Sequence, residues 1–282
     1  FGSSGREGRR QVKAASAGGT PDAAMHRSMS SWTGLHCVID AHADAHPDSL
    51  AAADHGGAWT YAQLRDASLR AAAAFRAAGL CGSAAPSWDA HPSAPRPLAL
   101  DVSRGRHWYA LCVAAWRLGL PVVAVSRDMP DKDGERERNA RIGRELRPLA
   151  LVLAGGEESG RGIDVPEDCL VLRYDALLGL MEDPGADVDL EPSVVSPESV
   201  LVYSYTGGTT KHSKCLVVTH AMALWEMAHY ASALHDSMSR SDRVLQFTST
   251  YWGAAAFGQL DMALAFGACT VFSVACDVGG IA

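Results

Sequence analysis

The strongest constraint on the fold is an alternation of short apolar runs and helical patterns that begins at Pro97. Expected strands cover 98–102, 121–125 and 148–154, and expected helices cover 106–118 and 135–146. Parallel strands need a long crossover connection, which is usually a helix. The order therefore predicts βαβ units and a parallel sheet covered on both faces.

The same rhythm continues through the last third of the chain. Further strands are expected over 200–203, 215–218, 244–247 and 269–273, with helices over 221–234 and 254–266. The stretches 155–165 and 181–197 are polar and are expected to be loops. We therefore expect an α/β fold of layered sheets, built from βαβ units and flanked by helices.

Ordered structure is expected to begin near residue 32. Helices are expected over 33–45 and 61–78, with a strand over 49–54 between them. Thr60 and Gln63 have the spacing of a capping box, which would start the second helix. Residues 1–31 are rich in Gly, Ser, Ala and Arg, which is typical of a disordered or non-native tail. Because that stretch has few acids, part of an organellar transit segment is the alternative.

Composition excludes several functional classes. The 282 residues are 48% hydrophobic, which is enough for a large core. The sequence has no stripe of basic residues, so nucleic acid is not an expected partner. The apolar stretch 108–125 contains Arg117 and Pro121, so it is not expected to span a membrane. The cysteines form no C-x-x-C pair and are expected to be free thiols in a reducing, cytoplasmic compartment. No metal site is expected, and His42 and His46 are interpreted as surface residues.

A glycine- and threonine-rich stretch at 205–214 carries the clearest chemical signal. It reads Tyr-Thr-Gly-Gly-Thr-Thr-Lys-His-Ser-Lys, and no Asp or Glu occurs from 199 to 225 although the formal net charge is −7. Such a loop offers backbone amides, hydroxyls and lysines to a polyphosphate. The alternative is an ordinary hairpin loop with solvated lysines. It is not a Walker loop, because neither Gly207 nor Gly208 is followed by Gly-Lys at the required spacing.

The order of residues from 205 to 220 resembles the phosphate-binding loop of the adenylate-forming superfamily. That superfamily includes acyl-CoA synthetases, luciferases and the adenylation domains of nonribosomal peptide synthetases, with the pattern Tyr-Thr-Ser-Gly-Thr-Thr-Gly-x-Pro-Lys-Gly-Val-x-x-Thr-His. Matching positions are Tyr205, Thr206, Gly208, Thr209, Thr210, Lys214, Thr219 and His220. The departures are Gly207 for Ser, Lys211 for Gly, Ser213 for Pro, Cys215 for Gly and Leu216 for Val. Lys211 matters most, because a Gly there can adopt positive φ at no steric cost.

Weaker similarities occur in the same order elsewhere in the chain. The segments 59–64, 114–123, 242–249 and 265–271 each resemble a stretch of adenylation domains. The resemblance thus covers about 32–273 and implies the large N-terminal domain of an adenylate-forming enzyme, present in part. It implies that 32–282 is an incomplete AMP-binding domain. Later motifs of the family are not found, so the chain is expected to be a fragment that is inactive by itself.

The resemblance also implies the chemistry. Members of the superfamily activate a carboxylic acid with ATP and Mg²⁺ to an acyl-adenylate, and a thiol of CoA or carrier-bound phosphopantetheine then accepts the acyl group. Carried over to this chain, the phosphate-binding residues are Thr206, Gly207, Gly208, Thr209, Thr210, Lys211 and Lys214. No catalytic residue is assigned. A small carboxylic acid, and an acyl-carrier domain where the acceptor is carrier-bound, are the expected partners.

The acid pocket is expected to begin at Tyr251, Trp252 and Gly253. Domains that load α-amino acids carry an Asp near this point as counter-ion for the ammonium group, whereas Gly253 and the following Ala254 cannot pair a cation. Because a buried unpaired ammonium is costly, the acid is not expected to be an α-amino acid. Core packing is the alternative role for the two aromatic residues.

Two other functions stay open from the sequence. The departures at Lys211 and Cys215 are compatible with a catalytically inactive family member that serves as a nucleotide-binding or scaffold module. A plain α/β domain of unrelated function would show no stabilisation by ATP.

Overall fold

The computed structural model describes residues 32–82, 95–125, 131–155, 162–183, 185, 188, 190, 193, 195–206, 214–234 and 237–273. The predicted tail at 1–31 lies outside them. The helices are α2 (His36–Ala45), α3 (Tyr61–Ala77), α4 (Arg106–Arg117), α5 (Lys132–Leu146), α6 (Tyr174–Glu182), α7 (His220–Leu234) and α8 (Gly253–Phe266). The strands are β1 (Leu50–Asp54), β2 (Gly57–Thr60), β3 (Leu98–Asp101), β4 (Val122–Ala124), β5 (Ala150–Leu153), β6 (Leu170–Arg173), β7 (Val200–Tyr205), β8 (Cys215–Thr219), β9 (Arg243–Gln246) and β10 (Cys269–Phe272).

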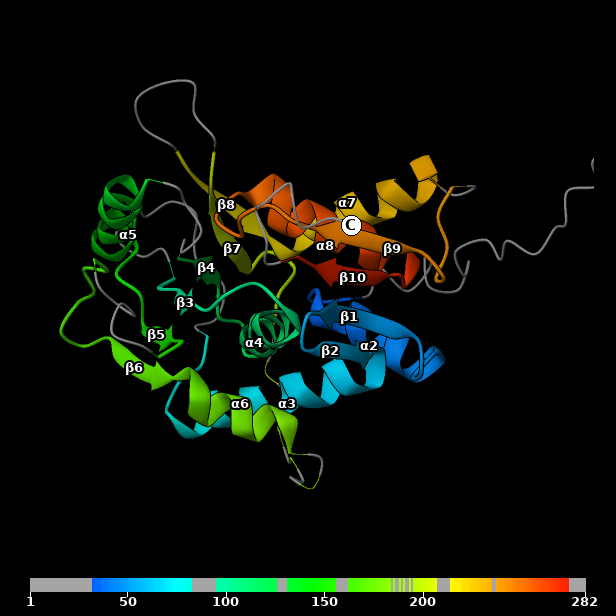
Figure 1. Ribbon diagram of the computed structural model, residues 1–282, viewed down its shortest axis with the longest axis horizontal. Helices are drawn as coiled ribbons and strands as arrows, with labels where there is room; N and C mark the ends of the chain where they lie inside the picture. Colours follow the sequence, from blue (N-terminus) through cyan, green and yellow to red (C-terminus); the bar gives the residue numbers. More distant parts are fainter. Residues whose placement is uncertain are drawn as a thin grey trace, which may run out of the picture.

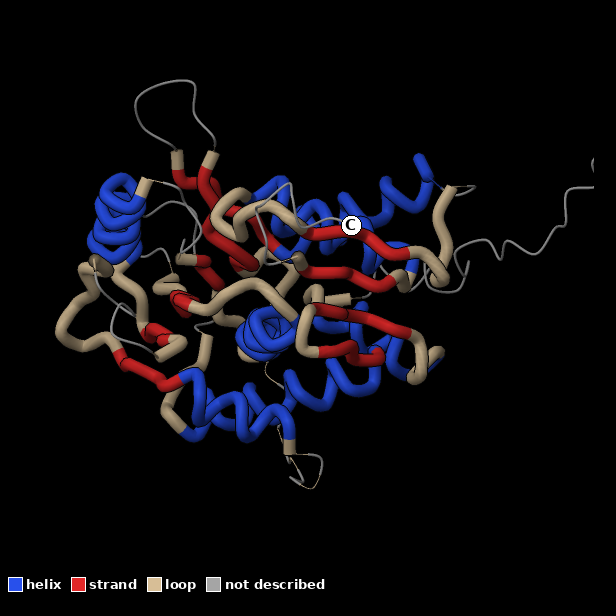
Figure 2. The backbone as a smooth tube through the Cα atoms, viewed as in Figure 1, coloured by secondary structure: helices blue, strands red, loops and turns tan. Residues whose placement is uncertain are grey.

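The strands form two sheets (Figure 1). The six-stranded sheet has the order β6-β5-β3-β4-β7-β8, and the four-stranded sheet has the order β2-β1-β10-β9. All neighbours are parallel except β7 with β8 and β1 with β2. The expected layered sheets with parallel pairing are thus present, and their strands are red in Figure 2; the one difference is that each sheet also has an antiparallel edge strand. The connections in these two pairs are too short for a crossover, so they close hairpins.

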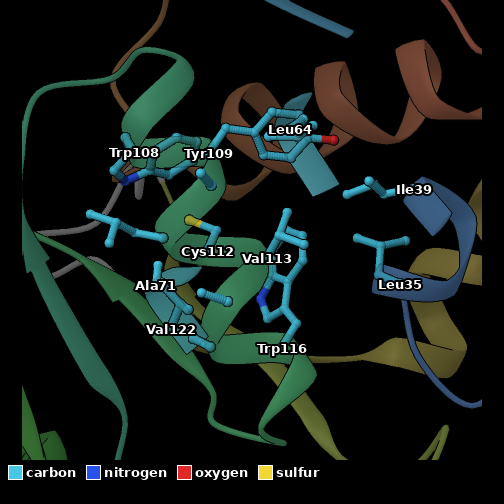
Figure 3. Packing of buried hydrophobic residues seen from close by; sticks show 14 of the residues in the cluster. Leu35, Ile39, Leu64, Ala71, Trp108, Tyr109, Cys112, Val113, Trp116 and Val122 are labelled. Atoms are coloured by element: carbon cyan, nitrogen blue, oxygen red, sulfur yellow. The ribbon is translucent and has the colours of Figure 1, made fainter. Parts of the chain in front are cut away.

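Helix α4 is the centre of the core. It packs against β1 of the smaller sheet, β4 of the larger sheet and helix α3, and Figure 1 shows it between the two sheets. Every residue from Trp108 to Arg117 is buried. The indole of Trp116 donates a hydrogen bond to the carbonyl of Leu201 at 3.2 Å. Figure 3 shows Trp108 and Trp116 at different heights of α4, within a buried cluster that also includes Leu35 and Leu64.

The one charged side chain in this buried stretch, Arg117, is paired. Its guanidinium donates to both carboxylate oxygens of Asp40, at 2.5 and 2.9 Å, and to the hydroxyl of Ser68 at 2.9 Å. The helix can thus be apolar on every side and still end in a cation, because α2 and α3 supply the partners. A buried charge without partners would cost several kcal/mol.

The predicted capping box at the start of α3 is confirmed. The backbone amide of Gln63 donates to the Thr60 hydroxyl oxygen at 3.3 Å, and the backbone amide of Thr60 donates to the side-chain Oε1 of Gln63 at 2.9 Å. The expected helices and strands are present, with ends that differ by a few residues. Strand β6 and helix α6 were not predicted from the sequence. Leu170 and Val171 of β6 are 37% and 50% exposed, so this strand lacks the apolar burial of the others.

The interpretation of His42 as a surface residue is wrong. It is 3% exposed, and its Nε2 lies 2.7 Å from the carbonyl oxygen of Leu264 in α8. A Cβ on Gly267 would lie 2.8 Å from the imidazole ring, so a glycine at the end of α8 leaves room for this histidine.

Two tryptophans should differ sharply in their effect on stability. Trp116→Ala removes a side chain that is fully buried between the sheets, and we expect a loss of about 3–5 kcal/mol in the free energy of unfolding. Trp225→Ala, on the outer side of α7 with 64% exposure, should change it by about 0.5 kcal/mol or less. Urea denaturation of both variants measures the difference. Equal losses would contradict the central position of α4.

Candidate active site

The glycine- and threonine-rich loop is carried by the hairpin of β7 and β8 at the edge of the larger sheet. Its two ends are tied to each other. The amide of Thr206 donates to the carbonyl of Lys214 at 3.0 Å, and the amide of Lys214 donates to the hydroxyl oxygen of Thr206 at 3.1 Å. The side chain of Lys214 is exposed. The other predicted phosphate ligands, Gly207, Gly208, Thr209, Thr210 and Lys211, lie outside the described residues.

The predicted acid-pocket segment lies against the base of this hairpin. Tyr205 and Trp252 form an isolated parallel bridge, and the amide of Tyr205 donates to the carbonyl of Tyr251 at 3.4 Å. The rings of Tyr205 and Tyr251 stack at 5.0 Å with an interplanar angle of 9°. The structure thus brings the base of the glycine- and threonine-rich loop into contact with residues 251 and 252.

The three predicted pocket residues have different surroundings. Tyr251 is 1% exposed and belongs to a buried cluster with Ile142 and Tyr203, so it packs in the core. Trp252 is half-buried and packs against the same cluster. Gly253 begins α8, and a Cβ there would lie 2.3 Å from the hydroxyl oxygen of Ser204 on β7. A larger side chain at position 253 would have to displace Ser204.

A carboxyl group does occur further along α8, but it is buried. Asp261 is 2% exposed, and its Oδ1 has no hydrogen-bond partner among the described residues. Burial, and secondarily the nearby Glu226, raise the pKa of Asp261 well above its usual range. Burial thus disfavours the charged form of Asp261, which is the form that would pair with an ammonium group.

Two arginines that the sequence analysis missed lie over these aromatic rings. The guanidinium carbon of Arg138 is 3.9 Å from the ring centre of Tyr251 and 5.3 Å from that of Trp252. The guanidinium carbon of Arg141 is 5.6 Å from the ring centre of Tyr205. Both belong to α5 and are three positions apart, which places them on one face of the helix. That spacing was the available signal, but nothing in the sequence indicated which element the face would meet.

The last residue of the loop motif, His220, is part of the core. It is fully buried, and its Nδ1 accepts a hydrogen bond from the amide of Leu35 at 3.0 Å. Burial, reinforced by the neighbouring His36, lowers its pKa to about 3. The imidazole is therefore neutral and ties the start of α7 to the chain just before α2.

The described residues offer no ligand set for a metal. No group of three or more His, Cys, Asp or Glu side chains among them could hold an ion. The cysteines in the described part of the chain are free thiols. Within the same residues, none of the helices is both long enough and apolar enough to cross a membrane.

A protein-family model matches most of this chain. Residues 39–277 match the model described as AMP-binding enzyme. This chain belongs to that family. The match includes the hairpin loop, the segment 251–253 and both sheets, so the membership implied by the loop motif is confirmed.

Relatives of this AMP-binding chain are much longer proteins. It is 25% identical over 236 residues to the nonribosomal peptide synthetase ungA of Aspergillus violaceofuscus, covering 83% of this chain and 2% of that protein. It is 28% identical over 190 residues to the phenyloxazoline synthase MbtB of Mycolicibacterium paratuberculosis, covering 67% of this chain and 14% of that protein. The chain thus spans a small part of the relatives that it matches.

Solved structures confirm the fold. VinN superposes with a TM-score of 0.67 at 23% identity, covering 85% of this chain and 57% of that chain. The N-terminal subdomain of NpsA from Klebsiella oxytoca, in complex with 3-hydroxybenzoyl-AMSN, superposes with a TM-score of 0.68 at 18% identity, covering 89% and 56%. The expected α/β architecture, with sheets flanked by helices, is that of these N-terminal subdomains.

The buried histidines predict an acid-sensitive fold. The pKa is lowered to about 4 in His36 and His42 and to about 3 in His220, mainly by burial. Each of these imidazoles binds a proton near pH 6.5 in the unfolded chain, but only near pH 4 or below in the folded chain. The free energy of unfolding should therefore be highest above about pH 6.5 and should decrease as the pH falls toward about 4. His220→Gln removes one of these groups, so the slope of the free energy of unfolding against pH should become less steep by about 1.4 kcal/mol per pH unit between those pH values.

Urea denaturation from pH 7.5 to 4.5 measures the slope for the unsubstituted chain and for the variant. The raised pKa of Asp261 acts in the opposite direction, but it is common to both proteins and cancels in the difference. His55→Gln, in the exposed turn between β1 and β2, is the control and should keep the full slope. An unchanged slope in His220→Gln would contradict the assignment.

Proposed function

We propose that this chain provides the phosphate loop and part of the acid pocket of a ligase that activates a carboxylic acid with ATP. The products would be an acyl-adenylate and pyrophosphate, and the acyl group would pass to a thiol of CoA or of carrier-bound phosphopantetheine. Membership of the AMP-binding family supports acid activation by adenylation. The roles proposed for the loop and the pocket rest on one observation: residues 251–253 contact the base of the loop, where Thr206 and Lys214 are hydrogen-bonded to each other.

The chemistry requires an anionic carboxylate to approach the α-phosphorus of a polyanion. Groups that hold and spread the phosphate charge are therefore the main requirement. In this proposal Lys214 and the hydroxyls of Thr206, Thr209 and Thr210 bind the β- and γ-phosphates, together with the backbone at Gly207 and Gly208. Lys211 adds a further cation. The absence of Asp and Glu from 199 to 225 supports the proposal, because no carboxylate in that stretch competes with the nucleotide.

The family implies that Mg²⁺ accompanies ATP. The described residues contain no group of three or more His, Cys, Asp or Glu side chains that could ligate a metal. The part proposed for this chain is to hold the phosphates at the loop and to present the acid beside Trp252.

The acid is proposed to lack an α-ammonium group. Gly253 supplies no carboxylate and packs too closely on Ser204 to be replaced by one without displacement. VinN has been solved with L-aspartate and with 3-methylaspartate, and NpsA with 3-hydroxybenzoyl-AMSN, so proteins of this fold serve both amino acids and aryl acids. For this chain, the surroundings of Gly253 favour an aryl or aliphatic acid.

Lys214→Ala should weaken binding of MgATP. A charge-assisted hydrogen bond contributes about 1.5–3 kcal/mol, so we expect the dissociation constant to rise about 10- to 100-fold. Titration calorimetry with the 282-residue chain measures this directly. Lys132→Ala is the control, because that lysine lies on α5 and is paired with Glu135 at 3.0 Å.

Two results would count against the phosphate site. Equal affinity in Lys214→Ala and the unsubstituted chain would remove Lys214 from it. No detectable binding or stabilisation by MgATP would overturn the phosphate site proposed for this chain. Binding of MgATP without activation of any acid, in a longer protein that also carries the later motifs of the family, would favour the scaffold function.

A panel of acids tests the proposed substrate class. In ATP–pyrophosphate exchange by a longer protein that carries this chain together with the later motifs of the family, benzoate, 3-hydroxybenzoate or hexanoate should support at least about tenfold more exchange than L-leucine, L-phenylalanine or L-aspartate, because an unpaired buried ammonium disfavours the latter group. Binding of the same acids in the presence of MgATP provides a second readout. Preference for an ordinary α-amino acid would overturn this part of the proposal.

A further inference from the structure

The side chain of Arg138 connects helix α5 to the segment that begins the acid pocket. Its guanidinium lies over Tyr251 and Trp252, and its Nη1 is buried without a hydrogen-bond partner among the described residues. Its main described contacts are thus with aromatic faces. An arginine placed over aromatic rings attracts them through the ring quadrupole, and the attraction grows as water is excluded.

The rings beneath Arg138 continue into the loop base. Tyr251 stacks on Tyr205 at 5.0 Å, and Arg141 lies over the ring of Tyr205. The two arginines are three positions apart, which is a rise of about 4.5 Å along an α-helix. This rise is close to the 5.0 Å between the centres of the stacked rings. One face of α5 therefore holds two neighbouring rings, one from the strand that leads into the phosphate loop and one from the pocket segment.

Trp252 is the member of this group that can meet a ligand. Tyr251 is 1% exposed, whereas Trp252 is half-buried, packs edge-on against Tyr251 at 4.9 Å, and immediately precedes Gly253. Backbone bonding fixes the position of Trp252 through its bridge to Tyr205. The orientation of its indole depends on the groups that pack against the ring. Among the described residues these include Tyr251 and the guanidinium of Arg138.

We propose that Arg138 is a positioning residue for acid binding: it holds the Trp252 indole in the orientation that forms one wall of the acid pocket. This role rests on the proposed function, because it assumes that Trp252 faces the acid. Arg138 acts through Trp252 and need not touch the substrate. Its removal should therefore affect the acid more than the nucleotide.

Fluorine NMR of the 5-fluorotryptophan-labelled chain measures the orientation without any ligand. The Trp252 resonance is assigned by its loss in Trp252→Phe. We expect Arg138→Met to shift or broaden that resonance, and Arg138→Lys to do so less, since an ammonium can also lie over the rings. Arg136→Met, on the same helix with a 60% exposed side chain paired with Asp133, should leave it unchanged.

Acid binding is then measured with 3-hydroxybenzoate and hexanoate in the presence of MgATP. Arg138→Met should raise the dissociation constant or KM of the acid about three- to tenfold, with the MgATP constant changed less than about twofold. In a Trp252→Leu background the same substitution should have no further effect on the acid. A purely structural role would instead give additive effects and equal losses for both ligands.

The outcomes separate this inference from the proposed function. An unmoved Trp252 resonance in Arg138→Met overturns the positioning role whatever the activity, and so does additivity in the Trp252→Leu background. If Arg138→Met does not fold, the same measurements on Arg138→Lys decide, with an unmoved resonance and an unchanged acid constant as the contrary result. If the unsubstituted chain binds neither MgATP nor any acid, the proposed function fails, and the acid-binding role fails with it even where the resonance shift is found.

Discussion

The burial of α4 between the two sheets is the constraint on which the rest of the structure depends. Its residues Trp108–Arg117 face protein on every side, so neither sheet can form its inner surface without it. The helix reaches the smaller sheet at β1 and the larger sheet at β4. Because Arg117 is neutralised by Asp40 from α2, the buried helix also fixes the position of the chain's first described helix. The packing of the core, the Arg117–Asp40 ion pair and the placement of the two sheets thus all depend on α4.

The arrangement explains how two distant parts of the sequence come into contact. The hairpin of β7 and β8 belongs to the larger sheet, whereas residues 251–253 lead from β9 of the smaller sheet into α8. They meet where Tyr205 bridges to Trp252 and Gly253 packs on Ser204. Arg104, just before α4, connects the chain after β3 of the larger sheet to the ends of β10 and β9 in the smaller sheet. It donates to the carbonyls of Ser273 and Thr248, at 2.5 and 3.1 Å.

Local periodicity in the sequence predicted most elements, because buried parallel strands and their crossover helices have distinct apolar patterns. The β6–α6 pair escaped prediction because β6 is an edge strand with exposed Leu170 and Val171, so its pattern resembles a surface loop. His42 was misjudged since its burial comes from α8, more than two hundred positions away. Family resemblance located the loop, but the stacking of Arg138 on Tyr251 is a tertiary contact that no local pattern encodes.

The mutual hydrogen bonds of Thr206 and Lys214 have a consequence for energetics. They hold the two ends of the loop together within the folded hairpin, independently of any ligand. The entropy of closing the loop is therefore lost during folding, and it would not reduce the affinity for a ligand that binds at the proposed site. Substitutions that loosen this closure would transfer that entropic cost to the binding step, and they would lower the affinity even where every group proposed to contact the ligand is retained.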